Sequence, residues 1–167
     1  MSMPKQKPGK SFQSYATPWE FIRAVEGRFG PIVCDLAAAP SNAKAKRFYG
    51  PSDDSLTKEW AADYPEGLLW LNPPFAKIGK WAAKCATESA KRSGGHIVML
   101  VPASIGTDWF ALSVEREAHV IALSPRMIFD GAPINPKTGK PDGYPKDLML
   151  VVYTCGLTGF STWRWKE

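Results

Sequence analysis

Short apolar segments alternate with amphipathic ones through most of the chain. Apolar runs predict buried strands at 32–36, 68–71, 96–101, 119–123 and 148–153. Apolar residues at helical spacing predict helices over 18–28 and from 78 to about 92, and Thr107 is a candidate N-cap for a third helix. Apolar strands separated by helices are typical of parallel sheets covered on both faces. We therefore expect an α/β fold in which helices cover both faces of a mostly parallel central sheet.

Two further local patterns add to these elements. Thr17, Pro18 and Glu20 form a capping box, in which Thr17 caps the first helix and Pro18 occupies its first position. Residues 127–129 have the pattern of a further strand, and 160–167 the pattern of an edge strand.

A polar segment, 130–147, precedes the last buried strand and holds Lys137, Lys140 and Lys146. Segments of this length between strands are usually functional or disordered. We expect a basic loop over a binding face.

The composition is that of one globular domain. The 167 residues are 44% hydrophobic and 22% charged, and a chain of this length buries a core without a disulfide framework. No apolar stretch approaches the roughly 18 residues of a membrane span, and the N-terminus lacks the pattern of a signal peptide. Cys34, Cys85 and Cys155 are far apart and are interpreted as small buried hydrophobic residues. We expect a cytoplasmic protein that uses no metal and has no obligate protein partner.

The net charge of +5 is concentrated at the N-terminus. Residues 1–10 contain Lys5, Lys7 and Lys10 and no acidic residue, so 5 minus 3 leaves +2 for the rest of the chain. We expect a basic flexible arm at 1–14 followed by a single domain at 15–167. The lysines can contact DNA phosphates in a salt-sensitive way, or can keep a disordered terminus soluble, and the arm by itself favours the second interpretation.

The most informative motif is Asn72-Pro73-Pro74-Phe75, directly after the expected strand 68–71. An exocyclic amino group is a poor nucleophile because its lone pair is delocalised into the ring, and two acceptors in the plane of its N–H bonds favour a tetrahedral nitrogen. The Asn72 side-chain oxygen and the Pro73 carbonyl can supply these acceptors, and Phe75 can stack on a flipped base. Open α/β sheets bind ligands at this end of their strands. The alternative is a Pro-Pro turn that merely ends a strand.

A set of motifs occurs along the chain in a characteristic order. It comprises Tyr15-Ala16-Thr17-Pro18, Asp35-Leu36-Ala37-Ala38, Asn42, Asp54-Ser55-Leu56, Trp60, Asn72-Pro73-Pro74-Phe75, Trp81, Pro102 and Arg126-Met127-Ile128-Phe129. With this order, over about residues 15–153, the chain resembles the phage DNA N-6-adenine methyltransferase (Dam-like) family. The resemblance implies a Rossmann-like class I methyltransferase fold, S-adenosylmethionine as methyl donor, and N6 of adenine in DNA as acceptor.

The resemblance also implies roles for individual residues. The catalytic set is Asn72, Pro73, Pro74 and Phe75. Residues expected to contact the donor are Tyr15, Thr17, Pro18, Asp35, Ala37, Asp54 and Asn72. Residues expected to contact DNA are Lys5, Lys7, Lys10, Arg126, Lys137 and Lys140. Two positions depart from the family pattern, because no Gly-x-Gly follows the first strand and Phe75 replaces a more frequent tyrosine.

Some of these residues have simpler interpretations. Asp35 could be a solvated strand-end acid, although we favour a contact to the donor, and Asp54 lies in a turn where aspartate is common. Arg126 could equally form a structural salt bridge. The basic run Lys44, Lys46 and Arg47 could be a solvated run or a phosphate-binding patch, and we favour the solvated run. The tryptophans Trp60, Trp81 and Trp109 are interpreted as core residues.

We expect direct in-line methyl transfer to adenine N6, assisted mainly by orientation and electrostatics. Two alternatives stay open. The same motif serves methylation of cytosine N4 or of a protein glutamine amide, and a non-catalytic DNA-binding module could keep the fold. Because the sheet uses most of the chain, we expect no separate target-recognition domain, and the arm and the loop 131–146 are the candidates for reading sequence.

Overall fold

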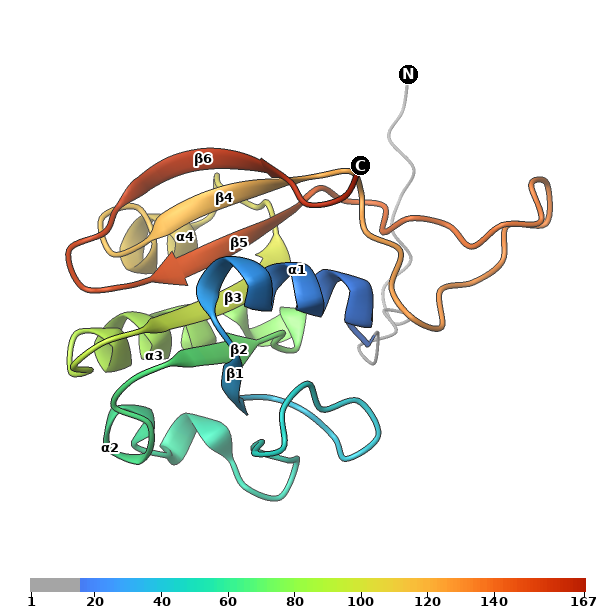
Figure 1. Ribbon diagram of the computed structural model, residues 1–167. Helices are drawn as coiled ribbons and strands as arrows, with labels where there is room; N and C mark the ends of the chain where they lie inside the picture. The colour runs from blue at the N-terminus through green and yellow to red at the C-terminus, as the bar shows by residue number, and fades with distance from the viewer. Residues whose placement is uncertain (1–15) are drawn as a thin grey trace.

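The computed structural model describes residues 16–167, which form a six-stranded sheet with helices packed on both faces (Figure 1). The strands are β1 (Ile32–Asp35), β2 (Leu68–Leu71), β3 (His96–Pro102), β4 (His119–Ser124), β5 (Leu148–Tyr153) and β6 (Gly159–Arg164). The helices are α1 (Trp19–Phe29), α2 (Trp60–Asp63), α3 (Ile78–Ser89) and α4 (Asp108–Ser113), with single 3-10 turns η1 (Ser55–Thr57) and η2 (Phe75–Lys77). The arm expected at 1–14, with Lys5, Lys7 and Lys10, and the donor-contact candidate Tyr15 lie outside the described residues.

The sheet has the strand order β1-β2-β3-β5-β4-β6. Three pairs are parallel, β1 with β2, β2 with β3 and β4 with β6, whereas β5 is antiparallel to both of its neighbours, β3 and β4. The mostly parallel sheet expected from the sequence is therefore a mixed sheet. A parallel return after β4 would need a crossover connection, which is usually helical. The connecting segment 125–147 contains no helix, and the chain turns back directly to place β5 between β3 and β4.

Each face of the sheet carries its own core, because successive side chains of a strand point to opposite faces. On one face, Phe21, Ile22 and Val25 of α1 pack against a cluster that includes Trp70 of β2. On the other face, α3 packs against a cluster in which Trp60 and Trp81 stack, with ring centroids 6.2 Å apart. The expected helices on both faces are confirmed.

The ends of two helices differ from the sequence-based expectation. Pro18, not Thr17, is the N-cap residue of α1, and within residues 16–167 no side chain caps this helix. Thr107 occupies the N-cap position of α4, as expected, but its hydroxyl donates to the Ser104 carbonyl and makes no capping hydrogen bond to the described residues.

The prediction of a strand at 127–129 is wrong. Met127 and Phe129 are buried in the α1-side core, but the backbone there joins no sheet strand, and the Met127 carbonyl accepts the N–H of Tyr144 within the same long connection. The edge strand expected within 160–167 is present as β6.

The apolar pattern also predicts which cysteines are buried, and it fails once. Cys34 and Cys85 are buried as expected, whereas Cys155 is exposed. No helix within residues 16–167 combines the length and apolar character that a membrane span requires.

Candidate active site

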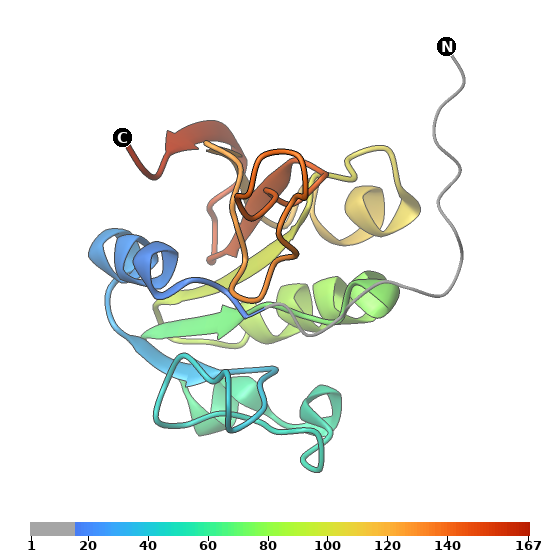
Figure 2. The same ribbon diagram turned by 90° about the vertical axis from the view of Figure 1, so that its right-hand side faces the viewer.

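A cavity of about 1430 Å³ opens where β1, β2 and β3 end. It is lined by Asp35 at the end of β1, Asn72 directly after β2, and Pro102 at the end of β3. Three strands contribute because the carboxyl ends of parallel strands meet at one edge of a sheet. In Figure 2, which looks toward this edge, the connection 125–147 lies in front of the sheet, and the loop that follows β1 lies below it.

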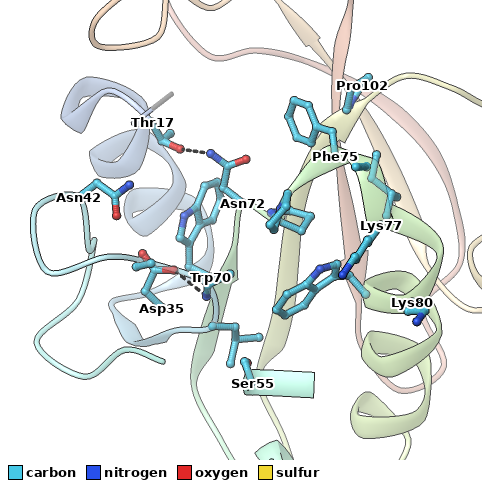
Figure 3. A pocket seen from close by; sticks show the side chains of 18 of the residues that line it. Thr17, Asp35, Asn42, Ser55, Trp70, Asn72, Phe75, Lys77, Lys80 and Pro102 are labelled. Carbon is cyan, nitrogen blue, oxygen red and sulfur yellow. Dashed lines mark hydrogen bonds between the residues drawn. The ribbon is translucent and has the colours of Figure 1, made fainter. Parts of the chain in front are cut away.

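Asn72 is held in place by the residue that precedes α1. Its Nδ2 donates a hydrogen bond to Thr17 Oγ1 at 3.1 Å, and Thr17 is only 2% exposed (Figure 3). The hydroxyl that the sequence assigns to a helix cap therefore binds the motif 55 residues away. This hydrogen bond fixes the plane of the Asn72 side-chain amide, in which Nδ2 is the donor and Oδ1 is the acceptor. Pro73 is buried and Pro74 exposed, so the rigid backbone of the motif runs from the core into the cavity.

Aromatic side chains form the cavity wall on one side of Asn72. Phe75 lies on the opposite side of Asn72 from Asp35 and Asn42 (Figure 3). Its ring makes an edge-to-face contact with Tyr144 at 5.9 Å, and Tyr144 contacts Phe129 in the same way at 5.5 Å. The connection 125–147 thus contributes Phe129 and Tyr144 to the wall. A flat apolar surface of this kind suits a planar heterocycle.

Asp35 closes the loop that follows β1. It is 3% exposed, so the interpretation as a solvated acid is wrong. Its Oδ1 accepts the N–H of Ala37 at 3.3 Å and its Oδ2 accepts the N–H of Lys44 at 2.9 Å. Burial raises the pKa of the Asp35 carboxyl, and the hydrogen bonds from Lys44 and Ala37 oppose this rise. Both Asp35 and Ala37 line the cavity, so the acid organises the loop while it borders the site.

The end of the cavity away from Thr17 is formed by the loop before α2 (Figure 3). Asp54 lines it with a left-handed backbone, φ 43°, whereas Asp53 closes a turn by accepting the N–H of Gly50 at 2.6 Å. Ser55 is 6% exposed, and its hydroxyl has no hydrogen-bond partner in the described part of the chain. Of the tryptophans expected in the core, Trp60 is fully buried, whereas Trp81 borders the cavity as well as the core.

Positive charge lies on the aromatic side of the cavity. Lys77 and Lys80, from the first turns after the motif, and Lys146 line it. Sequence reasoning missed Lys77 and Lys80, although their place directly after Phe75 was a usable signal. Lys137 and Lys140 are exposed in the same connection as Lys146 but do not line the cavity.

Arg126 is engaged in a salt bridge. Its Nη2 lies 3.0 Å from Oδ1 of Asp147, and both side chains are exposed. The structural alternative for this residue is therefore realised, and the bridge joins the two ends of the connection 125–147.

Lys44 is the largest departure from the expected site. The prediction of a solvated run holds for Lys46 and Arg47 but is wrong for Lys44, which is 6% exposed and lines the cavity. Its ammonium lies 4.7 Å from the centre of the Trp19 ring. The sequence around Lys44 carries no signal of this burial, because the covering residue belongs to α1.

In the part of the chain that the structure describes, no three His, Cys, Asp or Glu side chains are grouped to hold a metal ion. The chemistry available to the cavity is that of an amide, two prolines, aromatic rings, buried carboxyl and ammonium groups, and a rim of lysines. This set can orient a planar amino group and contact an anion.

Comparison with known proteins shows the family to which the chain belongs. The chain is 32% identical over 116 residues to a DNA N-6-adenine-methyltransferase of Escherichia phage T1, which covers 70% of the chain and 47% of that relative. It is 28% identical over 142 residues to a DNA N-6-adenine-methyltransferase of Haemophilus phage HP1, which covers 83% of the chain and 77% of that relative. The chain thus spans about half the length of the T1 protein. The DNA N-6-adenine-methyltransferase (Dam) family model matches residues 6–157, and the chain belongs to this family, as its motif order indicated.

Proposed function

We propose that this chain is a DNA methyltransferase that transfers a methyl group from S-adenosylmethionine to N6 of adenine, with the sheet of a Rossmann-like class I enzyme. The observation that carries the proposal is the Thr17-held amide of Asn72, which lies between two different halves of one cavity. Both relatives are named for this activity. The cavity also exceeds the roughly 300–1,000 Å³ typical of a site for one small ligand, so a donor and a flipped base fit together.

The half of the cavity beside β1 suits the methyl donor. It combines buried polar groups with apolar walls. The Ser55 hydroxyl, which has no hydrogen-bond partner among the described residues, is satisfied if a ligand supplies one. Asp35, Ala37 and Asp54 hold the donor from the loops, and Thr17 and Pro18 approach it from the start of α1. When bound, S-adenosylmethionine supplies an electrophilic methyl group on a sulfonium centre.

The half beside Phe75 suits the target base. Oδ1 of Asn72 and the carbonyl of Pro73 accept the two N–H bonds of the amino group, which directs the nitrogen lone pair out of the ring plane. Phe75 stacks on the extruded adenine, and Tyr144 supports Phe75 from the side. The Thr17 hydrogen bond holds the Asn72 amide and the two prolines restrict the backbone that carries the Pro73 carbonyl, so little reorganisation is needed during the reaction.

Lysines from separate segments contact the DNA backbone. Lys77 and Lys80 line the cavity on the same side of Asn72 as Phe75 (Figure 3), and Lys137 and Lys140 extend this basic surface along the exposed connection. Phosphate contacts position a protein on the duplex, whereas base contacts specify the sequence. The connection 125–147, together with Arg126 at its base and Lys5, Lys7 and Lys10 of the N-terminal arm, therefore supplies the surface on which a target site is read.

The experiment that tests this function is a methylation assay on the full chain. The protein is incubated with S-adenosylmethionine and unmethylated DNA, and the nucleosides are analysed by mass spectrometry. N6-methyladenine supports the proposal. N4-methylcytosine would show that cytosine is the acceptor, and methylated protein beside unmodified DNA would show that a protein amide is. Binding of DNA without any methylation would show that the chain is a non-catalytic DNA-binding module.

Thr17→Val is expected to lower the single-turnover rate of DNA methylation about 10-fold. Valine keeps the shape of threonine but removes the oxygen that accepts the hydrogen bond from Asn72 Nδ2. The Asn72 amide then loses its fixed plane, and its N–H group loses a partner. Thr17→Ser keeps the hydroxyl and is the matched control, with a near wild-type rate. If both variants are equally slow, the hydrogen bond does not position Asn72.

Lys77→Ala and Lys80→Ala are each expected to weaken DNA binding several-fold and to reduce the salt dependence of log K by about one unit. The measurement is a fluorescence-anisotropy titration at several salt concentrations. Arg116→Ala is the control, because Arg116 is exposed before the amino end of β4, at the opposite edge of the sheet. Equal salt slopes for all three variants would place the DNA elsewhere.

A further inference from the structure

Lys44 is a buried cation that forms no ion pair with another residue of the described part of the chain, 16–167. It is 6% exposed, and in residues 16–167 its ammonium takes part in no ion pair or hydrogen bond, only in the contact with the face of Trp19. Burial lowers the pKa of Lys44, and the charges of Asp130 and Asp35 offset part of this effect. Because an unpaired buried charge is costly, a side chain held in this way beside a cavity is expected to have a ligand for a partner.

The backbone around Lys44 offers few alternative donors to an anion. In a glycine-rich turn after the first strand, free N–H groups point at the ligand and bind its negative charge. In the loop that follows β1 here, backbone N–H groups instead donate hydrogen bonds to three kinds of acceptor within the protein. The N–H groups of Ala37 and Lys44 donate to the Asp35 carboxylate, and that of Ala39 donates to the Asn42 side chain. The remaining pairs involve carbonyls, with Ala38 donating to Tyr49, and Asn42 and Ala43 to Ala39.

The position of Lys44 indicates which part of a ligand it meets. Trp19, under the ammonium, is the first residue of α1, and Thr17, two residues earlier, holds Asn72. In the half of the cavity beside β1, Ser55 lies at the end opposite to Thr17 (Figure 3). A donor whose sulfonium is beside Asn72 has a nucleoside end and an amino-acid end. The Ser55 hydroxyl, which lacks a hydrogen-bond partner in the part of the chain that the structure describes, suits the polar nucleoside, and the Lys44 ammonium suits the carboxylate.

We propose that Lys44 binds the carboxylate at the amino-acid end of S-adenosylmethionine, and so replaces the free N–H groups of a glycine-rich turn. This proposal rests on the function proposed above, since it assigns a residue to the donor of that reaction. Trp19 holds the lysine side chain across the cavity wall, and Asp35 holds its backbone through the Lys44 N–H.

The test compares two ligands that differ in this carboxylate alone. Affinities of the full chain for S-adenosylmethionine and for decarboxylated S-adenosylmethionine are measured by titration calorimetry. Wild type is expected to bind the intact donor about 10- to 100-fold more tightly, as a charge-assisted contact predicts. Lys44→Met keeps the length of the side chain, and we expect it to weaken binding of the intact donor by this factor without weakening binding of the decarboxylated one. Lys46→Met, an exposed lysine two residues away, should retain the wild-type preference.

Four results would overturn the inference, and they are distinguishable. Equal wild-type affinity for both ligands would show that the carboxylate is not recognised, while the donor itself is. An equal loss of both affinities in Lys44→Met would assign Lys44 a structural role, and a loss of DNA affinity in place of donor affinity would make a phosphate its partner. If wild type binds neither ligand, the S-adenosylmethionine dependence proposed above fails together with the role of Lys44.

Discussion

Asn72→Ala is expected to slow DNA methylation by about 1000-fold while the affinity for S-adenosylmethionine stays within a few-fold of wild type. Alanine removes the proposed acceptor of the target amino group, and it leaves the loops after β1 and before α2 intact. The interaction matters most when the nitrogen becomes tetrahedral, so the loss falls on the chemical step. Single-turnover methylation gives the rate, and calorimetry gives the donor affinity.

Asn72→Asp is the matched variant for this test. It keeps an oxygen acceptor at the same position, and the Thr17 hydroxyl can turn to donate to it, so a part of the activity should remain. Methylation by Asn72→Ala at the wild-type rate would refute the proposed mechanism. A rate loss accompanied by an equal loss of donor affinity would instead make Asn72 a donor-binding residue.

Phe75→Ala is expected to lower methylation efficiency about 10- to 100-fold, because base–aromatic stacking contributes about 1–3 kcal/mol per base. The effect should appear mainly as weaker capture of the extruded base. It can be followed with 2-aminopurine placed at a modified site, whose fluorescence rises when the base leaves the stack. Donor affinity should be unchanged, since Phe75 lies on the other side of Asn72 from Asp35.

Two conservative variants separate stacking from packing. Phe75→Tyr keeps the flat ring and should have a mild effect, whereas Phe75→Leu keeps apolar volume beside Tyr144 but loses the ring face. Leucine with wild-type base capture would show that Phe75 serves only to pack the connection 125–147.

The motif Asn72 to Phe75 and the strand before it were predictable because their signals are local. An apolar run of four residues stopped by two prolines specifies a buried strand and its end, and β2 begins and ends where this pattern predicts. Asp35 at the end of β1 was identified as a site residue for the same reason, although both of its hydrogen-bond partners belong to the following loop.

Local sequence patterns determined most of the strands and helices and the place of Asn72-Pro73 directly after β2, since each depends on residues close together in sequence. The order of motifs along the chain determined the family. Only the tertiary structure decided that β5 runs against its neighbours, that the Thr17 hydroxyl serves Asn72 instead of capping α1, and that Lys44 is covered by Trp19. These three features depend on contacts between distant segments. A hydroxyl or an ammonium group interacts with whichever partner the packing of the chain brings near it. The local sequence pattern does not contain that partner.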